Sequence, residues 1–403
     1  MRSGSSFLLA ARQCEIAELE QLGRTGELVG AIGRFIHALQ RERGISNIYL
    51  VSQGRRFATQ RVTQVDECAV VEQEARGRFD ELDTEATRVR NGSRLFSRIA
   101  FVLHGLDGLP ALRERVATRE LSPADASAAY TRLVNGLLAV VFEAADAATD
   151  PEISRALVAL FNFMQGKEFA GQERAFGARA FAGGGIDAAG QQQWQHLIES
   201  QQACLQVFAA FSEAAVLQAE QAGRDVLALA EVERMRRVGC TGHILDPELS
   251  HAWYEWATRR IDAMRAMEDV LAGHLQRLCA SRIERARDEL RDQRALLAEL
   301  SQQAASAAAP APYGPHLERS ILELVQEQSQ RLQAMGDELD AVRASLNERK
   351  AVERAKGLLM AHRAMSEDEA YKTLRQMAMN QNRRLVDVAQ AVLSLADVLP
   401  GVR

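Results

Sequence analysis

The chain has 403 residues, of which 47% are hydrophobic, and it carries a formal net charge of −5 at pH 7. This length is sufficient for two or three domains with cores of their own. Only 5% of the residues are aromatic and eight are proline, whereas Ala, Leu, Gln, Glu and Arg are abundant. The composition therefore predicts an all-α fold and argues against a strand-rich one.

The sequence shows no segment that predicts targeting to a membrane or insertion into one. Residues 7–11 form an apolar run that is too short for a signal peptide, and no stretch approaches the roughly eighteen apolar residues of a membrane helix. We therefore expect a cytoplasmic protein without a membrane partner. The cysteines are odd in number and widely scattered, which predicts core positions rather than a disulfide framework: Cys14, Cys68, Cys204, Cys240 and Cys279.

A helix predicted from about Glu27 to Val51 places a charged residue on its apolar face. At about 100° per residue, Arg43 and Ser46 fall inside the apolar stripe, whereas Arg41 points to the opposite side. A buried guanidinium is costly unless it is paired, so Arg43 requires either an internal carboxylate or a bound anion. The stripe consists of Ile32, Phe35, Ile36, Leu39 and Leu50.

The next segments read as helices separated by short breaks. Residues 60–92 form a charged helical stretch, a further helix begins near Leu95, and the segment 105–110 interrupts it. Ser122 and Asp150 are predicted N-caps because each is followed by a proline at the first helical position. Long amphipathic helices joined in this way indicate stacked four-helix bundles.

The helix predicted from Glu152 to about Phe181 combines charged residues with glycines. Glu168 lies near the middle of its apolar stripe and Arg174 at one edge. The glycines allow a second helix or a ligand to approach closely. The alternative is a packing face of small residues with an internal pair between Glu168 and an arginine. The stripe consists of Ile153, Leu157, Leu160, Phe161, Met164, Gly171 and Ala175.

Three more helices are predicted after a glycine-rich loop at residues 182–185. They begin near Gln191, Arg224 and Asp246, and the last continues to about Leu300. Cys240 is near His243 and His251, but no second paired motif accompanies them, so we expect no metal. The sequence also shows no nucleophile and base set, no glycine-rich phosphate loop and no cofactor motif, so we expect no enzyme activity.

Three short motifs in this part of the chain resemble a NIT domain, a bacterial helical module that senses nitrate and nitrite. They lie at residues 40–46, 171–174 and 253–262, and the resemblance covers about residues 26–275. We assign residues 26–300 to this sensor domain and residues 1–25 to an N-terminal segment. The resemblance implies a pocket of arginines that holds the planar anion, which is the expected effector in place of a cofactor. The matching residues are Arg43, Arg174 and Arg236, with Arg234 and Arg237 as close competitors of the third.

Residues 301–316 are rich in Ala, Ser, Gln and Pro, which predicts a linker. In the segment 317–347 apolar residues recur at mostly 4-3 spacing, with one irregular step. This pattern is typical of a coiled-coil seam, which would suit a homodimer; the alternative is one amphipathic helix packed on its own sensor domain. The segment from Leu317 to Glu348 has a net charge of −4. The repeat consists of Ile321, Leu324, Gln328, Leu332, Met335, Leu339, Val342 and Leu346.

The last segment, residues 348–400, predicts three short helices with a basic surface. The second helix opens with a capping box at residues 366–369, and Pro400 stops the third. Between Arg349 and Arg384 nine Lys and Arg stand against four Asp and Glu, a net charge of +5. Such a charge on a small helical unit suits a phosphate backbone, although a solvated charged face has the same composition.

The segment resembles an ANTAR domain, the RNA-binding output module of bacterial transcription antiterminators. The resemblance covers about fifty-five residues and rests on the runs 355–360, 366–371, 374–375, 378–379 and 385–389. It implies binding to a pair of small hairpins in a nascent leader mRNA, which prevents termination. Together with the charge count it points to Lys356, Arg375, Asn382, Arg383 and Arg384 as RNA contacts. A DNA-binding helix-turn-helix regulator that responds to a small anion is the alternative.

The two resemblances together predict a one-component regulator of nitrate and nitrite assimilation genes. Without anion, the acidic connecting helix or the sensor surface is expected to cover the basic module. With nitrate or nitrite bound among the arginines, the bundle helices shift and release it.

Overall fold

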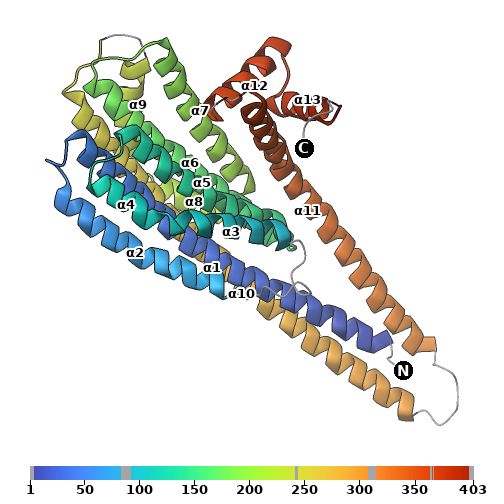
Figure 1. The fold of residues 1–403 in the computed structure, drawn as a ribbon. Helices are drawn as coiled ribbons and strands as arrows, with labels where there is room; N and C mark the ends of the chain where they lie inside the picture. Colours follow the sequence, from blue (N-terminus) through green and yellow to red (C-terminus); the bar gives the residue numbers. More distant parts are fainter. Residues whose placement is uncertain are drawn as a thin grey trace. The chain divides into compact units, whose positions relative to one another are not determined.

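The computed structural model describes residues 4–82, 92–240, 244–306, 315–363, 365 and 367–398. In these residues the regular secondary structure is entirely α-helical, so the all-α prediction is confirmed. The chain divides into two compact units, Met1–Glu327 and Gln328–Arg403, which are described separately. Figure 1 shows the helices in chain order.

Two very long helices run side by side through the first unit (Figure 1). They are α1, Gly4–Val51, and α10, Leu249–Ser306. Helix α1 passes without a break through residue 26, where the sequence analysis began the sensor domain. Its early residues Leu19 and Leu22 are buried, so the expected N-terminal segment is part of the packed bundle.

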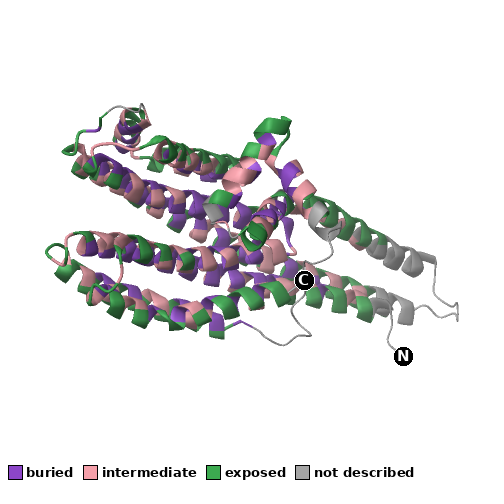
Figure 2. Ribbon diagram, turned by 45° about the horizontal axis from the view of Figure 1, so that its top comes forward, coloured by how far each residue is buried: buried purple, intermediate pink, exposed green. Residues whose placement is uncertain are grey.

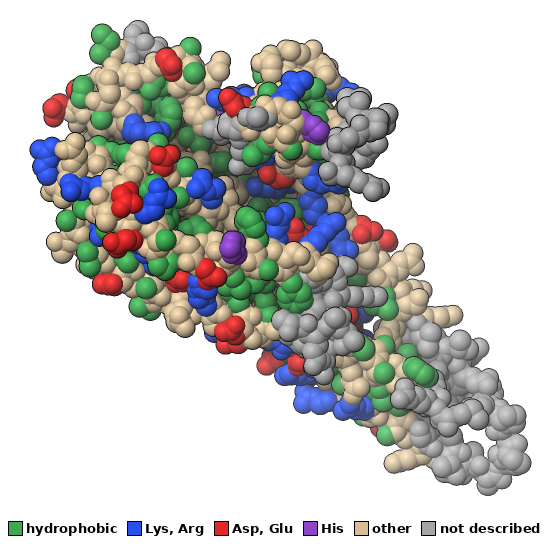
Figure 3. Space-filling view, viewed as in Figure 1, with side chains coloured by type: hydrophobic (Ala, Val, Ile, Leu, Met, Phe, Trp, Pro, Cys, Tyr) green, Lys and Arg blue, Asp and Glu red, His purple; other side chains and the backbone are tan. Residues whose placement is uncertain are grey.

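Helix α6, Pro151–Ala182, lies at the centre of this bundle, and most of its residues are buried. It packs against α1, α5, α7, α9 and α10. Figure 2 shows buried positions concentrated on the inward faces of the bundle helices, and Figure 3 shows acidic and basic side chains interspersed on its surface. The other helices of the bundle are α2 (Ala58–Asp80), α3 (Gly92–Asp107), α4 (Leu109–Ala117), α5 (Pro123–Ala147), α7 (Ala188–Phe211), α8 (Ala214–Gly223) and α9 (Val226–Cys240).

The two predicted N-caps and the predicted break at 105–110 are confirmed, whereas α1 begins at Gly4 rather than near Glu27 and α2 ends at Asp80, before residue 92. The Ser122 hydroxyl accepts a hydrogen bond from the Asp125 amide (3.1 Å), and the Asp150 carboxylate accepts one from the Ile153 amide (3.0 Å). The break expected at 105–110 occurs at Gly108, between α3 and α4. These caps satisfy N–H groups that the first turn of a helix leaves without partners.

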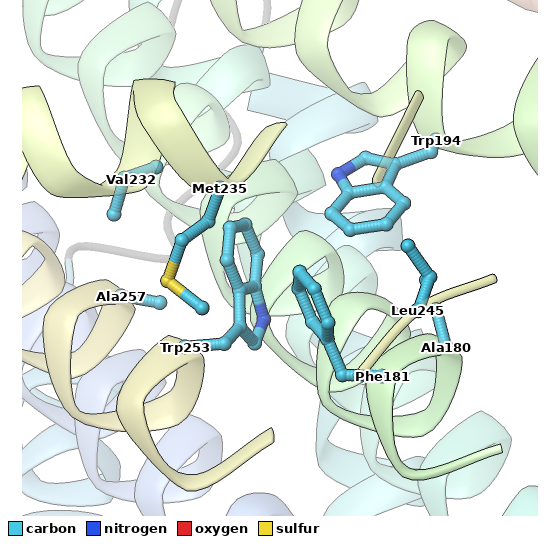
Figure 4. Close-up of a cluster of buried hydrophobic side chains, with 8 residues drawn as sticks. All are labelled: Ala180, Phe181, Trp194, Val232, Met235, Leu245, Trp253 and Ala257. Carbon is cyan, nitrogen blue, oxygen red and sulfur yellow. The ribbon is translucent and has the colours of Figure 1, made fainter. Parts of the chain in front are cut away.

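A cluster of aromatic side chains closes one end of the bundle (Figure 4). Trp194 of α7 and Trp253 of α10 meet edge to face with ring centroids 5.3 Å apart, and Phe181 of α6 packs against both. A Cβ added at Gly177 would lie 2.4 Å from the Trp253 ring. The close approach of α6 and α10 therefore requires glycine at this position.

In the described residues two segments are long and apolar enough to cross a membrane by length and composition alone. They are Ser93–Ala117 and Pro123–Ala147, each with a mean hydropathy of 1.2. The first is not a single helix, because it breaks at Gly108. It also carries Arg113, which pairs with a buried glutamate. The second is α5, which packs against α1, α3 and α6 as a core helix does.

The second unit contains most of α11, Pro315–Arg363, followed by α12, Glu367–Gln381, and α13, Leu385–Val398. Its core brings all three helices together and consists of Ala355, Leu374, Ala378, Val388 and Ala389. The boundary expected at residues 347 and 348 falls inside α11, so the connecting helix and the first helix of the module are continuous. The expected linker is shorter than residues 301–316, because α10 extends to Ser306. The Ser366 cap and the Pro400 stop lie outside the described residues.

Candidate anion site and nucleic-acid interface

Arg43 lies on the buried stripe of α1, as predicted, and is paired with an internal carboxylate. Its Nη1 donates to Glu168 Oε1 (2.6 Å) and its Nη2 to Glu168 Oε2 (3.1 Å), so the guanidinium and the carboxylate meet as two forks. Nη1 also donates to the Thr131 hydroxyl of α5 (2.7 Å). Glu168 is fully buried, and Arg43 is 6% exposed. Of the two partners that the sequence left open for Arg43, the structure shows the carboxylate.

Arg174, on the same helix as Glu168, is also buried but has a different environment. Its Nη1 donates to the Thr258 hydroxyl of α10 (2.9 Å), and its guanidinium stacks over the Tyr254 ring at 4.9 Å from the centroid. No ion pair with an acidic side chain is found for Arg174 among the described residues. Asp262 is close enough to feel its charge, but burial raises the pKa of that carboxyl. Arg174 is therefore a buried cation whose contacts in the described residues are a hydroxyl and an aromatic ring rather than a carboxylate.

Two glycines bring Arg43 and Arg174 to one place between α1 and α6. A Cβ at Gly171 of α6 would lie 3.1 Å from Arg43 Nη2, and a Cβ at Gly44 of α1 would lie 3.2 Å from Arg174 Nη2. Each guanidinium thus crosses the interface and ends against the backbone of the opposite helix. The two predicted arginines therefore end at the same interface between α1 and α6.

The third predicted arginine, Arg236 of α9, belongs to a separate buried network. It forms a forked pair with Glu173 (2.7 and 2.6 Å) and donates to Gln201 Oε1 (3.0 Å). Arg260 of α10 donates to the same amide oxygen (2.8 Å), and Trp194 Nε1 donates to Glu173 (3.0 Å). No contact of Arg236 with Arg43 or Arg174 is found in the described structure. Its competitors Arg234 and Arg237 point outward and pair with Glu231 and Glu233.

This second network shares one carboxylate between two arginines. Burial and the nearby charge of Arg236 together lower the pKa of Arg260 to about 10, although the charge of Glu173 acts in the opposite direction. Burial alone would raise the pKa of Glu173, but the hydrogen bonds and charge of Arg236 outweigh that effect and lower it. Glu173 therefore stays ionised and holds α6, α7 and α9 together.

In the C-terminal unit the polar corner between α12 and α13 contains three predicted RNA contacts. Asn382 adopts a left-handed conformation (φ 49°), and the Arg383 amide donates to the Ala378 carbonyl (3.0 Å), which together end α12 in a Schellman motif. Asparagine adopts this left-handed conformation more readily than most residues, so the backbone accounts for Asn382 without an RNA contact. Arg383 is exposed. Arg384 is also exposed and donates to Asp387 (3.1 Å) and to Glu348 (3.4 Å).

The two other predicted RNA contacts lie away from this corner. Lys356 is only 8% exposed, and its Nζ pairs with Glu353 at 2.8 Å. Arg375 of α12 is half-buried. The structure therefore gathers Asn382, Arg383 and Arg384 on one exposed corner, with Lys356 partly withdrawn from solvent.

Several residues around the arginines were not singled out by sequence reasoning. They include Gln40, Gln172, Thr131, Tyr254 and Thr258. Gln40, Gln172, Tyr254 and Thr258 lie inside the NIT-like motifs, which could have indicated them. Nothing in the sequence distinguishes Thr131 from the other threonines. In the described part of the chain no group of three His, Cys, Asp or Glu could hold a metal; His243 lies outside that part.

Comparison with known proteins gives two family matches that together cover most of the chain. Residues 34–276 match the family described as nitrate and nitrite sensing (NIT), and residues 340–393 match the ANTAR domain. The nitrate regulatory protein of Klebsiella oxytoca is 35% identical over 96% of this chain and 93% of its own length. The structure of the NasR transcription antiterminator is similar with a TM-score of 0.63 and 32% identity, over 97% of this chain and 98% of that one.

Proposed function

We infer the function from the family: this chain belongs to the nitrate- and nitrite-sensing regulators, with a NIT domain followed by an ANTAR domain. It is a nitrate-responsive transcription antiterminator. Nitrate or nitrite binds between α1 and α6, and the C-terminal unit binds two hairpins of a leader mRNA of nitrate assimilation genes. The protein acts in the cytoplasm as a regulator, without catalysing a reaction on its effector.

The observation that carries this proposal is the excess of positive charge between α1 and α6. Two buried guanidiniums, Arg43 and Arg174, end at the same interface, and Glu168 is the only carboxylate forked to either of them in the described residues. A buried cation without a full counter-charge is costly, so the site favours an incoming anion. A planar oxyanion also matches the forked donors of arginine. Arg43 and Arg174 are the proposed binding residues, and Arg236 supports the site from the neighbouring network.

On the output side we assign RNA contact to the corner formed by Asn382, Arg383 and Arg384. Arginine contacts phosphate and stacks on unpaired bases, which suits a hairpin loop better than a continuous duplex. Lys356 and Arg375 are assigned a secondary role, because both are partly withdrawn from solvent. Nitrate shifts the helices around α6, and this shift makes the basic corner available to RNA. In the anion-free state the basic corner is covered, or the chain is prevented from forming a homodimer.

The proposal is tested by measuring nitrate affinity by calorimetry and leader-RNA affinity by gel shift, with and without nitrate. Arg174→Met is expected to weaken nitrate binding by at least about tenfold while the chain stays folded, because no carboxylate loses an ion-pair partner. Arg41→Met is the matched control, since Arg41 belongs to the NIT-like motif that contains Arg43 but is exposed. It should bind nitrate as wild type does.

The RNA arm uses Arg383→Ala combined with Arg384→Ala. This variant should bind the two-hairpin RNA more weakly and with a smaller dependence on salt, because fewer counterions are released. Its nitrate affinity should remain that of wild type. RNA binding that is equally tight with and without nitrate, or a preference for duplex DNA over the hairpins, would contradict the proposal. The second result would support the DNA-binding alternative.

A further inference from the structure

The Glu168 carboxylate binds the guanidinium of Arg43 in the way that an anionic ligand would. Its two oxygens receive hydrogen bonds from two different nitrogens of one guanidinium, at 2.6 and 3.1 Å. Nitrate, nitrite and a carboxylate all present a planar pair of oxygens to such a fork. The residue is fully buried, so water does not compete for this contact.

We propose that Glu168 is a built-in competitor of the ligand, which sets the affinity of the site and holds the chain in its anion-free state. The inference rests on the proposed function, because it assumes that the ligand is an anion bound at Arg43 and Arg174. Binding then exchanges one counter-anion of Arg43 for another. The measured affinity is the intrinsic affinity of the two arginines reduced by the strength of the internal pair.

The surroundings of Glu168 allow it to give up the guanidinium. Gln40 of α1 donates from Nε2 to Oε2 at 2.7 Å, and Gln172 of α6 donates from Nε2 to Oε1 at 2.9 Å. Each carboxylate oxygen therefore keeps one neutral donor when Arg43 turns toward a ligand. A buried carboxylate stripped of all donors would be far more costly. The charge of Lys167 is also close enough to interact with that of Glu168.

The exchange links occupancy of the site to the position of α6. The Arg43–Glu168 pair joins α1 to α6. Lys167, which precedes Glu168, joins α6 to α10 through its ion pair with Glu268 at 2.5 Å. Adjacent helical residues point about 100° apart, so these two buried pairs hold α6 from two sides. Replacing Glu168 by a ligand at Arg43 releases one side and leaves the other. This is a discrete change of state that the ligand can select.

The test replaces Glu168 by glutamine in the full-length chain, with nitrate as the probe. Glu168→Gln keeps the shape of the side chain and an acceptor oxygen but removes the charge that competes. It is expected to bind nitrate about tenfold more tightly than wild type in calorimetry. RNA binding measured in parallel should reach its half-maximum at a correspondingly lower nitrate concentration.

Glu42→Gln is the matched control. Glu42 of α1 is also fully buried and forms a forked pair with Arg113 (2.9 and 2.9 Å). Its carboxylate forms no ion pair with the guanidinium of Arg43 or Arg174 in the described structure. Both variants remove the acid of a buried pair, so any general effect of destabilisation appears in both. Only Glu168→Gln should tighten nitrate binding.

The possible outcomes separate this inference from the proposed function. If wild type binds nitrate and Glu168→Gln binds it equally or more weakly, Glu168 is not a competitor. If wild type shows no measurable binding but Glu168→Gln binds nitrate, the competition is stronger than proposed and the inference stands. If neither binds, both proposals are wrong. Should Glu168→Gln fail to fold, Glu168→Asp, which retains the charge but shortens the reach, should still tighten binding by a smaller factor.

Discussion

At the scale of residues, oppositely charged neighbours recur on the core helices. Glu42 and Arg43 are adjacent on α1, Glu173 and Arg174 on α6, and each member of a couple reaches a different helix. The buried ion pairs that they form with other helices add little net stability, because removing two charges from water costs about as much free energy as their attraction returns. Breaking one leaves a buried charge alone and costs about 3–5 kcal/mol. We infer that their main effect is to select which helices face each other.

His37 of α1 gives a prediction at this scale. Burial lowers its pKa from 6.5 to about 2, and the positive charges of Lys167 and Arg174 on α6, Arg265 on α10 and Arg41 on α1 act in the same direction. The folded chain therefore keeps this imidazole neutral, whereas the unfolded chain protonates it below about pH 6.5. Because the unfolded state binds the extra proton, the free energy of unfolding decreases as the pH falls.

The expected decrease from His37 is up to about 1.4 kcal/mol per pH unit between about pH 6.5 and 5, above the range where most carboxylates titrate. Denaturant unfolding at a series of pH values measures it. His37→Gln should flatten this dependence, whereas the same change at His251, which is exposed, should leave it intact. An equal slope in wild type and His37→Gln would show that another group is responsible.

At the scale of elements, the contact of α6 with α10 depends on a glycine. The Trp253 ring lies directly over Gly177, and its Nε1 donates to the Arg174 carbonyl at 3.0 Å. This bond ties the aromatic cluster to the helical turn that carries a proposed ligand residue. The cluster therefore contacts the turn of α6 that carries Arg174.

Gly177→Ala is expected to destabilise the chain by about 1–3 kcal/mol, because a Cβ at 2.4 Å from Trp253 forces the two helices apart. Nitrate affinity should fall as well, since Arg174 moves with α6. The control is Gly77→Ala on the exposed face of α2, where a Cβ meets nothing within 4 Å. There alanine should stabilise by about 0.5–1 kcal/mol through its helix propensity. Denaturant unfolding of the two variants would contradict the argument if both shifted in the same direction.

At the scale of the whole molecule, the proposed control of RNA binding by nitrate requires that the two ligands be linked thermodynamically. If nitrate raises the affinity for hairpin RNA by a certain factor, then saturating RNA must raise the affinity for nitrate by the same factor. We expect this factor to be about 5- to 150-fold, the usual range of coupling between sites.

Calorimetric titration of nitrate into the chain with and without saturating leader RNA measures this factor. The variant with Arg383→Ala and Arg384→Ala should show no increase at RNA concentrations that it does not bind. An unchanged nitrate affinity in wild-type chain saturated with RNA would mean that the two ligands act independently, and that nitrate controls antitermination by another route.

The sequence by itself determined the helices, their caps and the exceptional position of Arg43. These features depend on residues three or four positions apart, so periodicity and cap residues predict them, and the stripe from Ile32 to Leu50 is buried as expected. The short motifs also predicted that the chain resembles the NIT and ANTAR families. Local patterns did not predict how far each helix extends. The expected domain boundaries at residues 26, 301 and 347 fall inside continuous helices, because nothing local stops a helix there.

Only the tertiary structure decided which charges meet. Glu168 pairs with Arg43 across 125 positions, and Arg236 pairs with Glu173 rather than joining the other two arginines. Helix periodicity gives the direction of a side chain but not the helix that it faces. That choice depends on how α1, α6, α9 and α10 pack, since a buried guanidinium can pair only with a carboxylate on a helix that the packing brings within reach.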